Sequence, residues 1–357
     1  MHDISDLVRA HFQALFILVK KDMHLSIALA TYNGEMYIYD LLESIREQLR
    51  LPDELVIYDD CSTDATVNIV RKFAATVTFP VHIFINEKNV GFRQNFYNAI
   101  SACSFELIAL CDQDDIWQPE KISGCLRVFE ENSVDAVVHG YTVVDKDLKY
   151  LRFIRPAKKS TIQEPYEGSY LNCYVGFSVV FRADLLKGFD YLSRPVDPNF
   201  PKYQMAHDQW IALILFSKGR TYILPKSLVM YRQHAKNSIG FNMEGNRWRT
   251  QRILDFNIDR LRFLIRHIKY IKIYLKDALC KDHQKSASDL YWNTVLKNHY
   301  RRYVVYKSKA LKDILCNLLW ASYVGTYRSV RFGGFGALAF FKDTVNILVE
   351  KIRGKSY

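Results

Sequence analysis

Six aspartates follow two short apolar segments of this 357-residue chain. They are Asp59, Asp60 and Asp64 after residues 54–58, and Asp112, Asp114 and Asp115 after residues 106–111. Each segment is bounded by turn residues, which is typical of a buried parallel strand. The carboxyl ends of such strands share one crevice, and carboxylates gathered there repel one another unless protons or a cation neutralise them. The spacing predicts a divalent metal that holds a phosphorylated substrate, with strand termination and helix capping as the alternative for the first three aspartates.

The chain contains neither of the two common glycine-rich phosphate loops. No GxxxxGK[ST] motif occurs, no GxGxxG motif follows a strand, and the GGFG string at residues 333–336 lacks a strand-to-helix context. The phosphate must then be held in another way. In the DxD arrangement of Asp112 and Asp114, carboxylates can reach a metal that bridges two phosphate oxygens.

Alternating strands and helices position these carboxylates. Strands are predicted over residues 25–30, 54–59, 81–86 and 106–111, and helices over residues 37–49, 64–75, 92–102 and 119–132. This alternation predicts an α/β fold with a doubly wound, mostly parallel sheet. Further strands are predicted over residues 136–145, 177–182 and 221–231, with a helix over residues 206–218 and a polar loop over residues 156–172.

Composition excludes several classes of protein. Hydrophobic residues make up 49% of the chain and aromatic residues 14%, so a largely disordered protein is excluded. The seven cysteines form no CxxC pair, which argues against a structural zinc site and favours a reducing, cytoplasmic compartment. No apolar run reaches the roughly 18 residues that span a bilayer, and no secretory signal is predicted.

The chain divides into three parts. Residues 1–22 form an N-terminal extension, and Met23, immediately before the first predicted strand, is a candidate for the native start. Residues 23–240 form the α/β domain. Residues 241–357 form a helical C-terminal extension that is rich in aromatic residues and carries 23 Lys and Arg against 9 Asp and Glu. Within it, a stripe at helical spacing predicts packing against the domain, formed by Leu254, Ile258, Leu261, Ile265, Ile268, Leu275 and Leu279, with Ile271 as a substitute.

Six short motifs occur in order along the α/β domain. They are ATYNG at residues 30–34, YDDCSTD at 58–64, NVG at 89–91, CDQDDIW at 111–117, HD at 207–208 and YRQH at 231–234. The ordered set resembles the inverting nucleotide-sugar glycosyltransferases of family 2, which implies a GT-A fold over about residues 25–240. The DQDDIW and YRQH strings are most similar to transferases that build bacterial surface polysaccharides, rhamnosyltransferases among them.

The resemblance implies donor-binding roles for four residues. Thr31 and Asp59 would contact the nucleoside, with the Asp59 carboxylate accepting a hydrogen bond from the N–H of a uracil or thymine ring. Asp112 would face the ribose or the sugar. Arg93, just after the NVG motif, would contact the nucleotide, or would lie solvated at a helix start.

The resemblance also implies a metal site and a base. Asp114 would bind Mn²⁺ or Mg²⁺, and His234 would complete the metal shell or touch the diphosphate. A structural role is the alternative for His234, because hard cations prefer oxygen. Asp208 matches the family's general base, which takes the proton of the acceptor hydroxyl as this attacks the anomeric carbon. Asp208 also begins an apolar helix, so capping is its alternative role.

The predicted function is that of a metal-dependent inverting glycosyltransferase, which moves a sugar from a UDP- or dTDP-sugar to a hydroxyl of a glycan or lipid-linked acceptor in surface polysaccharide synthesis. One alternative is a nucleic-acid-binding protein that uses residues 241–357, and another is a catalytically inactive scaffold of the same fold. Carboxylates in the crevice would repel a nucleic-acid backbone, so no nucleic-acid partner is expected. Lys and Arg beside Tyr and Trp in residues 241–357 predict salt-reversible contact with anionic lipid at the inner face of the cytoplasmic membrane, with packing or self-association as alternatives.

Overall fold

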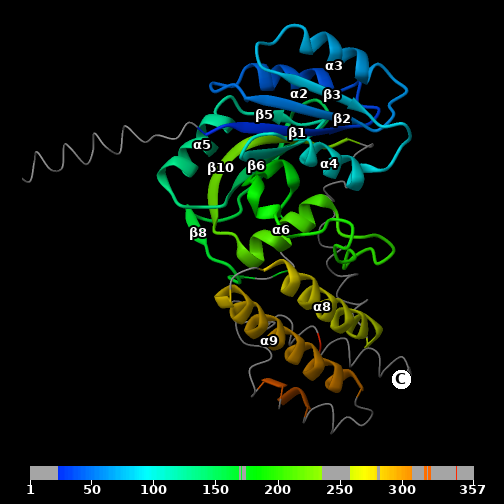
Figure 1. Cartoon of the computed structure of the whole chain (residues 1–357), viewed down its shortest axis with the longest axis vertical. Coiled ribbons are helices and arrows are strands. Elements are labelled where there is room, and N and C mark those ends of the chain that lie inside the picture. Colours follow the sequence, from blue (N-terminus) through cyan, green and yellow to red (C-terminus); the bar gives the residue numbers. More distant parts are fainter. Residues whose placement is uncertain are drawn as a thin grey trace, which may run out of the picture.

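A computed structural model describes the greater part of the α/β domain and two long helices that follow it (Figure 1). The described residues are 23–168, 170, 174–234, 258–279, 282–307, 317–319, 321–322 and 343. The predicted extension over residues 1–22 lies outside them, and so does Leu254 of the predicted stripe.

Within the described residues, the strands form one mixed sheet. They are β1 (Leu25–Thr31), β2 (Glu54–Asp59), β3 (Val81–Ile85), β4 (Leu107–Asp112), β5 (Ile116–Trp117), β6 (Ala136–Val144), β7 (Tyr150–Ile154), β8 (Thr161–Gln163), β9 (Val179–Arg182) and β10 (Thr221–Arg232). Their order is β3-β2-β1-β4-β9-β6-β10-β5, with β7 paired to β6 and β8 paired to β10. β1 runs parallel to β2 and β4, whereas β9 runs antiparallel between β4 and β6. The predicted α/β fold with a largely parallel central sheet is confirmed.

Helices cover both faces of this sheet. They are α2 (Ile38–Arg46), α3 (Thr66–Ala74), α4 (Phe92–Ser101), α5 (Lys121–Glu131) and α6 (His207–Lys218), joined by two short 3₁₀ turns, η1 (Gly176–Ser178) and η2 (Ala183–Leu186). Successive side chains of a strand point to opposite faces. Ile27 and Leu29 of β1 therefore pack in one core with α2, α3 and α5, while Ala28 packs in a second core with α4 and α6.

The sequence pattern does not predict β5, β7 or β8. β8 lies inside residues 156–172, the segment expected to be a polar loop, and pairs antiparallel with β10. β5 and β8 have only two and three residues, which is too short for an alternating pattern. Such a strand is recognised only from its pairing with a neighbouring strand. β9 begins at Val179, later than expected, because Gly176–Ser178 forms a 3₁₀ turn.

The helices α8 (Ile258–Ala278) and α9 (Asp282–Lys307) pack on the side of α6 that faces away from β1–β3 (Figure 1). Trp210 Nε1 of α6 donates a hydrogen bond to Tyr274 Oη of α8 (2.7 Å). The predicted stripe is confirmed over its described part, since the following members are buried: Ile258, Leu261, Ile265, Ile268, Ile271, Leu275 and Leu279. Part of this stripe lies in the same hydrophobic core as α6.

The aromatic residues of the C-terminal region are only partly available to a lipid surface. Tyr291, Trp292 and Tyr306 are buried, whereas Tyr300 is exposed. Because the first three are buried, they cannot contact lipid. For these residues, the prediction that Tyr and Trp of residues 241–357 lie at a lipid surface is corrected. None of the described helices is long and apolar enough to cross a membrane.

Candidate active site

The carboxyl ends of β1, β2 and β4 bring three predicted donor-binding residues together. Thr31 of β1 lies opposite Asp59 of β2 in the parallel ladder, and Asp112 of β4 lies opposite Ala30. Adjacent strands of a sheet are about 4.8 Å apart, so these residues share one short stretch of the sheet edge. The structure therefore brings the first aspartate of each predicted acidic cluster, Asp59 and Asp112, to the same edge of the sheet.

Asp59 is buried, and both of its carboxylate oxygens accept hydrogen bonds. Oδ2 accepts from Thr31 Oγ1 (2.7 Å) and Ser62 Oγ (2.6 Å), and Oδ1 accepts from the Ser62 amide (2.7 Å). These bonds fasten the turn after β2 to the end of β1. The contact of Thr31 and Asp59 with a nucleoside stays a prediction, for which the structure offers a rigid pair.

Asp60 and Asp64 hold neighbouring loops. The Asp60 carboxylate accepts hydrogen bonds from the amides of Val90 (2.7 Å) and Gly91 (2.8 Å). The Asp64 carboxylate accepts one from the Thr66 amide at the start of α3 (3.0 Å). In the structure, Asp60 anchors the loop before α4, and Asp64 caps the start of α3.

Asp114 and His234 meet although 120 residues separate them, with Asp114 Oδ2 and His234 Nε2 2.8 Å apart. The His234 ring stacks on Tyr37, with the ring centroids 4.4 Å apart. The Arg232 guanidinium lies over the same ring at 4.6 Å and donates a hydrogen bond to Asp40. Tyr37 thus contacts both Arg232 and His234 of the YRQH motif, and the sequence pattern does not predict this role for Tyr37.

A fully buried lysine lies behind the acidic loop. Lys121 Nζ donates a hydrogen bond to the Phe177 carbonyl (2.8 Å) and lies 3.4 Å from the centre of the Trp117 ring. Burial lowers the pKa of Lys121 to about 8, against the opposing pull of nearby acidic groups that include Asp115 and Asp112. Asp115 is also fully buried, and its Oδ2 has no hydrogen-bond partner among the described residues. Sequence reasoning missed Lys121, because an amphipathic helix gives no signal that one of its lysines points inward.

Asp208 lies in the first turn of α6 but does not cap this helix. The cap residue is Ala206, whose amide donates a hydrogen bond to Gln209 Oε1 (2.9 Å). Asp208 Oδ1 accepts only the amide hydrogen of Gln209 (2.7 Å) within the described structure. Burial, with a smaller contribution from Asp197, raises the pKa of Asp208 to about 6. Asp208 is therefore not the N-cap residue, although its carboxylate accepts a first-turn amide hydrogen, and its role as a base stays a prediction.

Asp112 links the acidic loop to Asp208. Burial, with smaller contributions from the nearby charges of Asp114 and Asp208, raises the pKa of Asp112 to about 8. The end of β4 also lies beside the start of α6, because a Cβ at Gly176 would lie 2.9 Å from His207 Nε2 and 3.5 Å from Leu110 Cδ1. We call Asp112, Asp114, Asp208 and His234 the candidate active site.

Arg93 of α4 contacts a different part of the crevice. Its Nη2 lies 3.5 Å from Asp197 Oδ2, and its guanidinium lies over the rings of Phe92 (4.6 Å) and Tyr203 (4.9 Å). None of these contacts within the described residues involves Thr31 or Asp59. The nucleotide contact of Arg93 stays a prediction.

Asp114 and His234 are the residues that could hold a metal. No group of three or more His, Cys, Asp or Glu side chains in the described parts of the chain could hold a metal ion. Mg²⁺ at nucleotide sites usually takes one or two carboxylates, with substrate phosphate and water completing its shell. Asp115, next to Asp114 in the chain, is buried, and burial raises the pKa of its carboxyl well above the ordinary value. These residues fit a divalent cation whose binding depends on a diphosphate.

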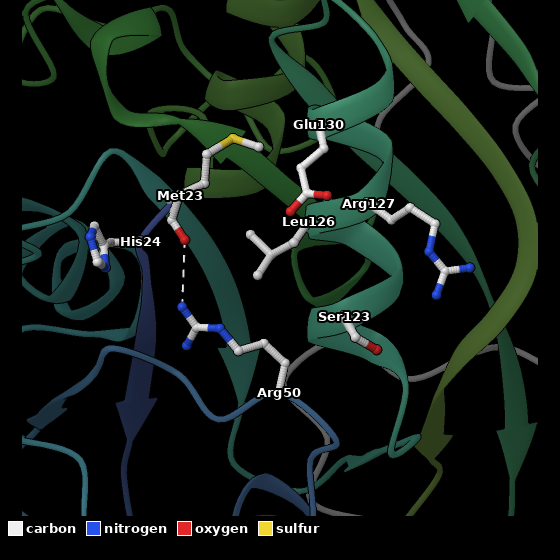
Figure 2. Close-up of a pocket in the computed structure, with 7 residues that line it drawn as sticks. All are labelled: Met23, His24, Arg50, Ser123, Leu126, Arg127 and Glu130. Atoms are coloured by element: carbon white, nitrogen blue, oxygen red, sulfur yellow. Dashed lines mark hydrogen bonds between the residues drawn. The ribbon is translucent and has the colours of Figure 1, made fainter. Parts of the chain in front are cut away.

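A separate hollow of about 380 Å³ lies at the start of β1, at the opposite edge of the sheet from Asp112 (Figure 2). Its lining includes Met23, Arg50 and Arg127. Arg50 Nη2 already contacts the Asp53 carboxylate (2.8 Å) and the Met23 carbonyl (3.5 Å). None of the residues of the candidate active site lines this hollow.

Replacing Gly176 by alanine is expected to disturb the start of α6. A Cβ at this position would lie 2.9 Å from His207 Nε2, and His207 is buried and stacked on Phe96 at 3.7 Å. The clash should lower stability by about 1–3 kcal/mol and displace Asp208, which follows His207. Thermal denaturation and a transferase assay measure the two effects.

Gly124→Ala on α5 is the matched control, because its Cβ would meet only Leu228 at 4.0 Å. This variant should be at least as stable as the wild type, since alanine favours a helix over glycine. A Gly176→Ala variant with wild-type melting temperature and activity would contradict the close approach to His207.

Comparison with known proteins agrees with the fold. Residues 26–189 match the family described as Glycosyl transferase family 2. The dTDP-rhamnosyl transferase RfbG of Shigella flexneri is 29% identical over 228 residues, which cover 60% of this chain and 74% of RfbG. The putative teichuronic acid biosynthesis glycosyltransferase TuaG of Bacillus subtilis is 25% identical over 261 residues, covering 72% of this chain and 96% of TuaG.

A solved structure extends the likeness of the fold. The structure of S. aureus TarS 1–349 in complex with UDP matches with a TM-score of 0.54 and 17% sequence identity, and covers 94% of this chain and 93% of that chain. At this identity the likeness concerns the fold alone, and it confirms the GT-A-type architecture. The matched segment, residues 26–189, and these relatives make this chain similar to the glycosyltransferases of family 2.

Proposed function

We propose that this protein is a metal-dependent, inverting glycosyltransferase that moves a sugar from a UDP- or dTDP-sugar to a hydroxyl of a glycan or lipid-linked acceptor in surface polysaccharide synthesis. The observation that supports the proposal most is that Gly176 lies against both His207, the residue before Asp208, and Leu110, two residues before Asp112. This closeness of α6 and β4 supports a candidate base beside a candidate diphosphate site, which inverting transfer needs.

The donor proposal also draws on the relatives. RfbG is named a dTDP-rhamnosyl transferase, and TarS has been solved with UDP and with UDP-GlcNAc. In this chain, Thr31 and Asp59 would contact the nucleoside, and Asp112 would face the ribose or sugar. Asp114 and His234 would hold Mn²⁺ or Mg²⁺, which when bound neutralises the charge that grows on the leaving diphosphate.

Asp208 would act on the acceptor. As the acceptor oxygen forms a bond to the anomeric carbon, the bond from that carbon to the diphosphate oxygen breaks on the opposite face. The hydroxyl proton passes to Asp208, and the configuration of the anomeric carbon inverts. The free Asp208 Oδ2 suits this task, because only Oδ1 accepts a hydrogen bond from the described residues.

Transfer activity is expected to fall as the pH drops through about 6. Burial raises the pKa of Asp208 to about 6, and a base accepts a proton only in its ionised form, which predominates above that pH. The pH dependence of kcat/KM reports the free enzyme, so kcat/KM should fall about tenfold per pH unit well below this pKa. A kcat/KM that stays constant across this range would speak against Asp208 as the base.

Thermal shift with UDP and dTDP, each with and without Mn²⁺, tests the donor proposal. A nucleotide that raises the melting temperature by at least about 3 °C only in the presence of metal would support it. Absence of any nucleotide-dependent shift would contradict it. A separate incubation with UDP- and dTDP-sugars distinguishes the inactive scaffold, because it would bind nucleotide without consuming a nucleotide sugar.

We also propose peripheral, salt-reversible binding to anionic membranes, at the inner face of the cytoplasmic membrane, through residues 241–357. The exposed face of α8 carries Arg262, Arg266, Lys269 and Lys276. Each basic residue near an anionic surface contributes about 1 kcal/mol. Flotation should show binding to vesicles with phosphatidylglycerol, none to neutral phosphatidylcholine vesicles, and release by salt. Binding that ignores lipid charge and salt, or none at all, would reject this proposal.

A further inference from the structure

The segment Tyr191–Met205, between η2 and α6, is held in place by its own side chains. The buried Arg194 donates hydrogen bonds from Nε to the Met205 carbonyl (2.7 Å) and from Nη1 to the Tyr191 carbonyl (2.7 Å). Tyr191 Oη donates one to the Arg93 carbonyl at the start of α4 (2.5 Å). The segment is therefore fastened at both ends, and it leads directly into the turn that carries Asp208.

An exposed tyrosine on this segment lies on a fixed guanidinium. Tyr203 is 56% exposed, and the Arg93 guanidinium lies 4.9 Å from the centre of its ring. The same guanidinium lies against Phe92 and is 3.5 Å from the buried Asp197. We call Tyr203, Arg93 and Asp197 the Tyr203 shelf. A large ring that stays half exposed, yet is backed by an immobilised cation, loses little conformational freedom when a ligand covers it.

The Tyr203 shelf lies beside the proposed base. The Phe92 ring, which backs Arg93, lies 6.5 Å from the ring of His207, the residue next to Asp208. The charges of Asp197 and Arg93 both act on the Asp208 carboxylate, in opposite directions. A ligand on Tyr203 would therefore lie close to Asp208.

The chemistry of the shelf suits an uncharged sugar. The electron-rich face of an aromatic ring attracts the C–H face of a pyranose, and a guanidinium group offers hydrogen bonds to its hydroxyls. Arg93 Nε has no hydrogen-bond partner among the described residues. Because the charges of Arg93 and Asp197 balance, the shelf gives no net attraction to an anionic ligand.

We propose that the Tyr203 shelf is the acceptor subsite, in which a neutral sugar ring stacks on Tyr203 and presents its hydroxyl to Asp208. This inference rests on the proposed function, since it names the acceptor class for the same site. It assigns Arg93 to the acceptor side of the crevice.

Saturation-transfer NMR with a panel of methyl glycosides of glucose, galactose, N-acetylglucosamine, mannose and rhamnose tests the subsite. The wild type should bind at least one of them, and Tyr203→Ala should weaken that binding about tenfold or more. Tyr203→Trp should keep it, because the stacking face remains. Tyr150→Ala is the matched control, since Tyr150 is 68% exposed on β7 and should bind as the wild type does.

Wild-type protein that binds no member of the panel, or a Tyr203→Ala variant that binds like the wild type, would overturn the subsite. The melting temperature of each variant shows that it is folded. The saccharide assay contains neither nucleotide nor metal, so it is separate from the test of the donor. If neither UDP nor dTDP binds, the proposed function is wrong. The saccharide assay would still decide whether a sugar binds at Tyr203.

Discussion

Replacing Asp208 by asparagine is expected to lower the rate of sugar transfer by about 10²- to 10⁴-fold, the range that a general base usually contributes. The asparagine keeps an oxygen that can accept the hydrogen bond from the Gln209 amide, so α6 should begin as before. It cannot take a proton from the acceptor hydroxyl. Nucleotide affinity should stay nearly the same, because the variant leaves the groups at the donor end in place.

Asp184→Asn is the matched control, since Asp184 is an exposed aspartate on η2 outside the candidate active site. Steady-state kinetics and nucleotide titration of both variants separate the base role from a general effect of losing one carboxylate. Turnover of Asp208→Asn close to that of the wild type would remove Asp208 from the mechanism.

Replacing Asp114 by alanine is expected to abolish the metal-dependent part of nucleotide binding and to lower transfer by at least about a hundredfold. The substitution removes the carboxylate that lies 2.8 Å from His234 Nε2, and with it the oxygen donor of the proposed pair. Titration of nucleotide with and without Mn²⁺ measures the first effect. Initial rates measure the second.

Asp147→Ala is the control for this variant, because Asp147 is exposed and its carboxylate pairs with Lys146, outside the candidate active site. It should bind nucleotide and metal as the wild type does. Wild-type protein that stays fully active after EDTA treatment would show that no metal takes part, and Asp114 would need another role.

The strand ends could be predicted because a local pattern encodes them. A parallel strand buried on both faces appears as a short apolar run, and the residue after it lies at the sheet edge whatever the rest of the chain does. Asp59 and Asp112 follow such runs, so their proximity could be inferred without a structure. The buried stripe of α8 was predictable for a similar reason, since helical spacing alone selects one face.

Contacts between distant segments could not be predicted in this way. Tyr37 stacks on His234, and the Gln113 side chain exchanges two hydrogen bonds with the backbone of Tyr32 (2.8 and 3.0 Å). These contacts depend on how the loops after β1, β4 and β10 converge. The local sequence pattern does not predict such convergence. For the same reason, it does not predict that the Lys121 side chain points into the protein interior.

The contacts of Arg93 could not be predicted from the motif that precedes it. Its side chain contacts Asp197 and Tyr203, on a segment about a hundred residues later, and its contact with a nucleotide stays a prediction. Loops between secondary-structure elements vary in length and path, so a motif places a backbone position better than it places a long side chain.

Proton NMR of the reaction with a panel of UDP- and dTDP-sugars, in the presence of Mn²⁺, tests the central claim most directly. The protein should consume at least one donor, release the nucleoside diphosphate, and form a glycoside whose anomeric configuration is opposite to that of the donor. A product with retained configuration would contradict Asp208 as the base of a single displacement, and failure to consume any nucleotide sugar would contradict the proposed activity.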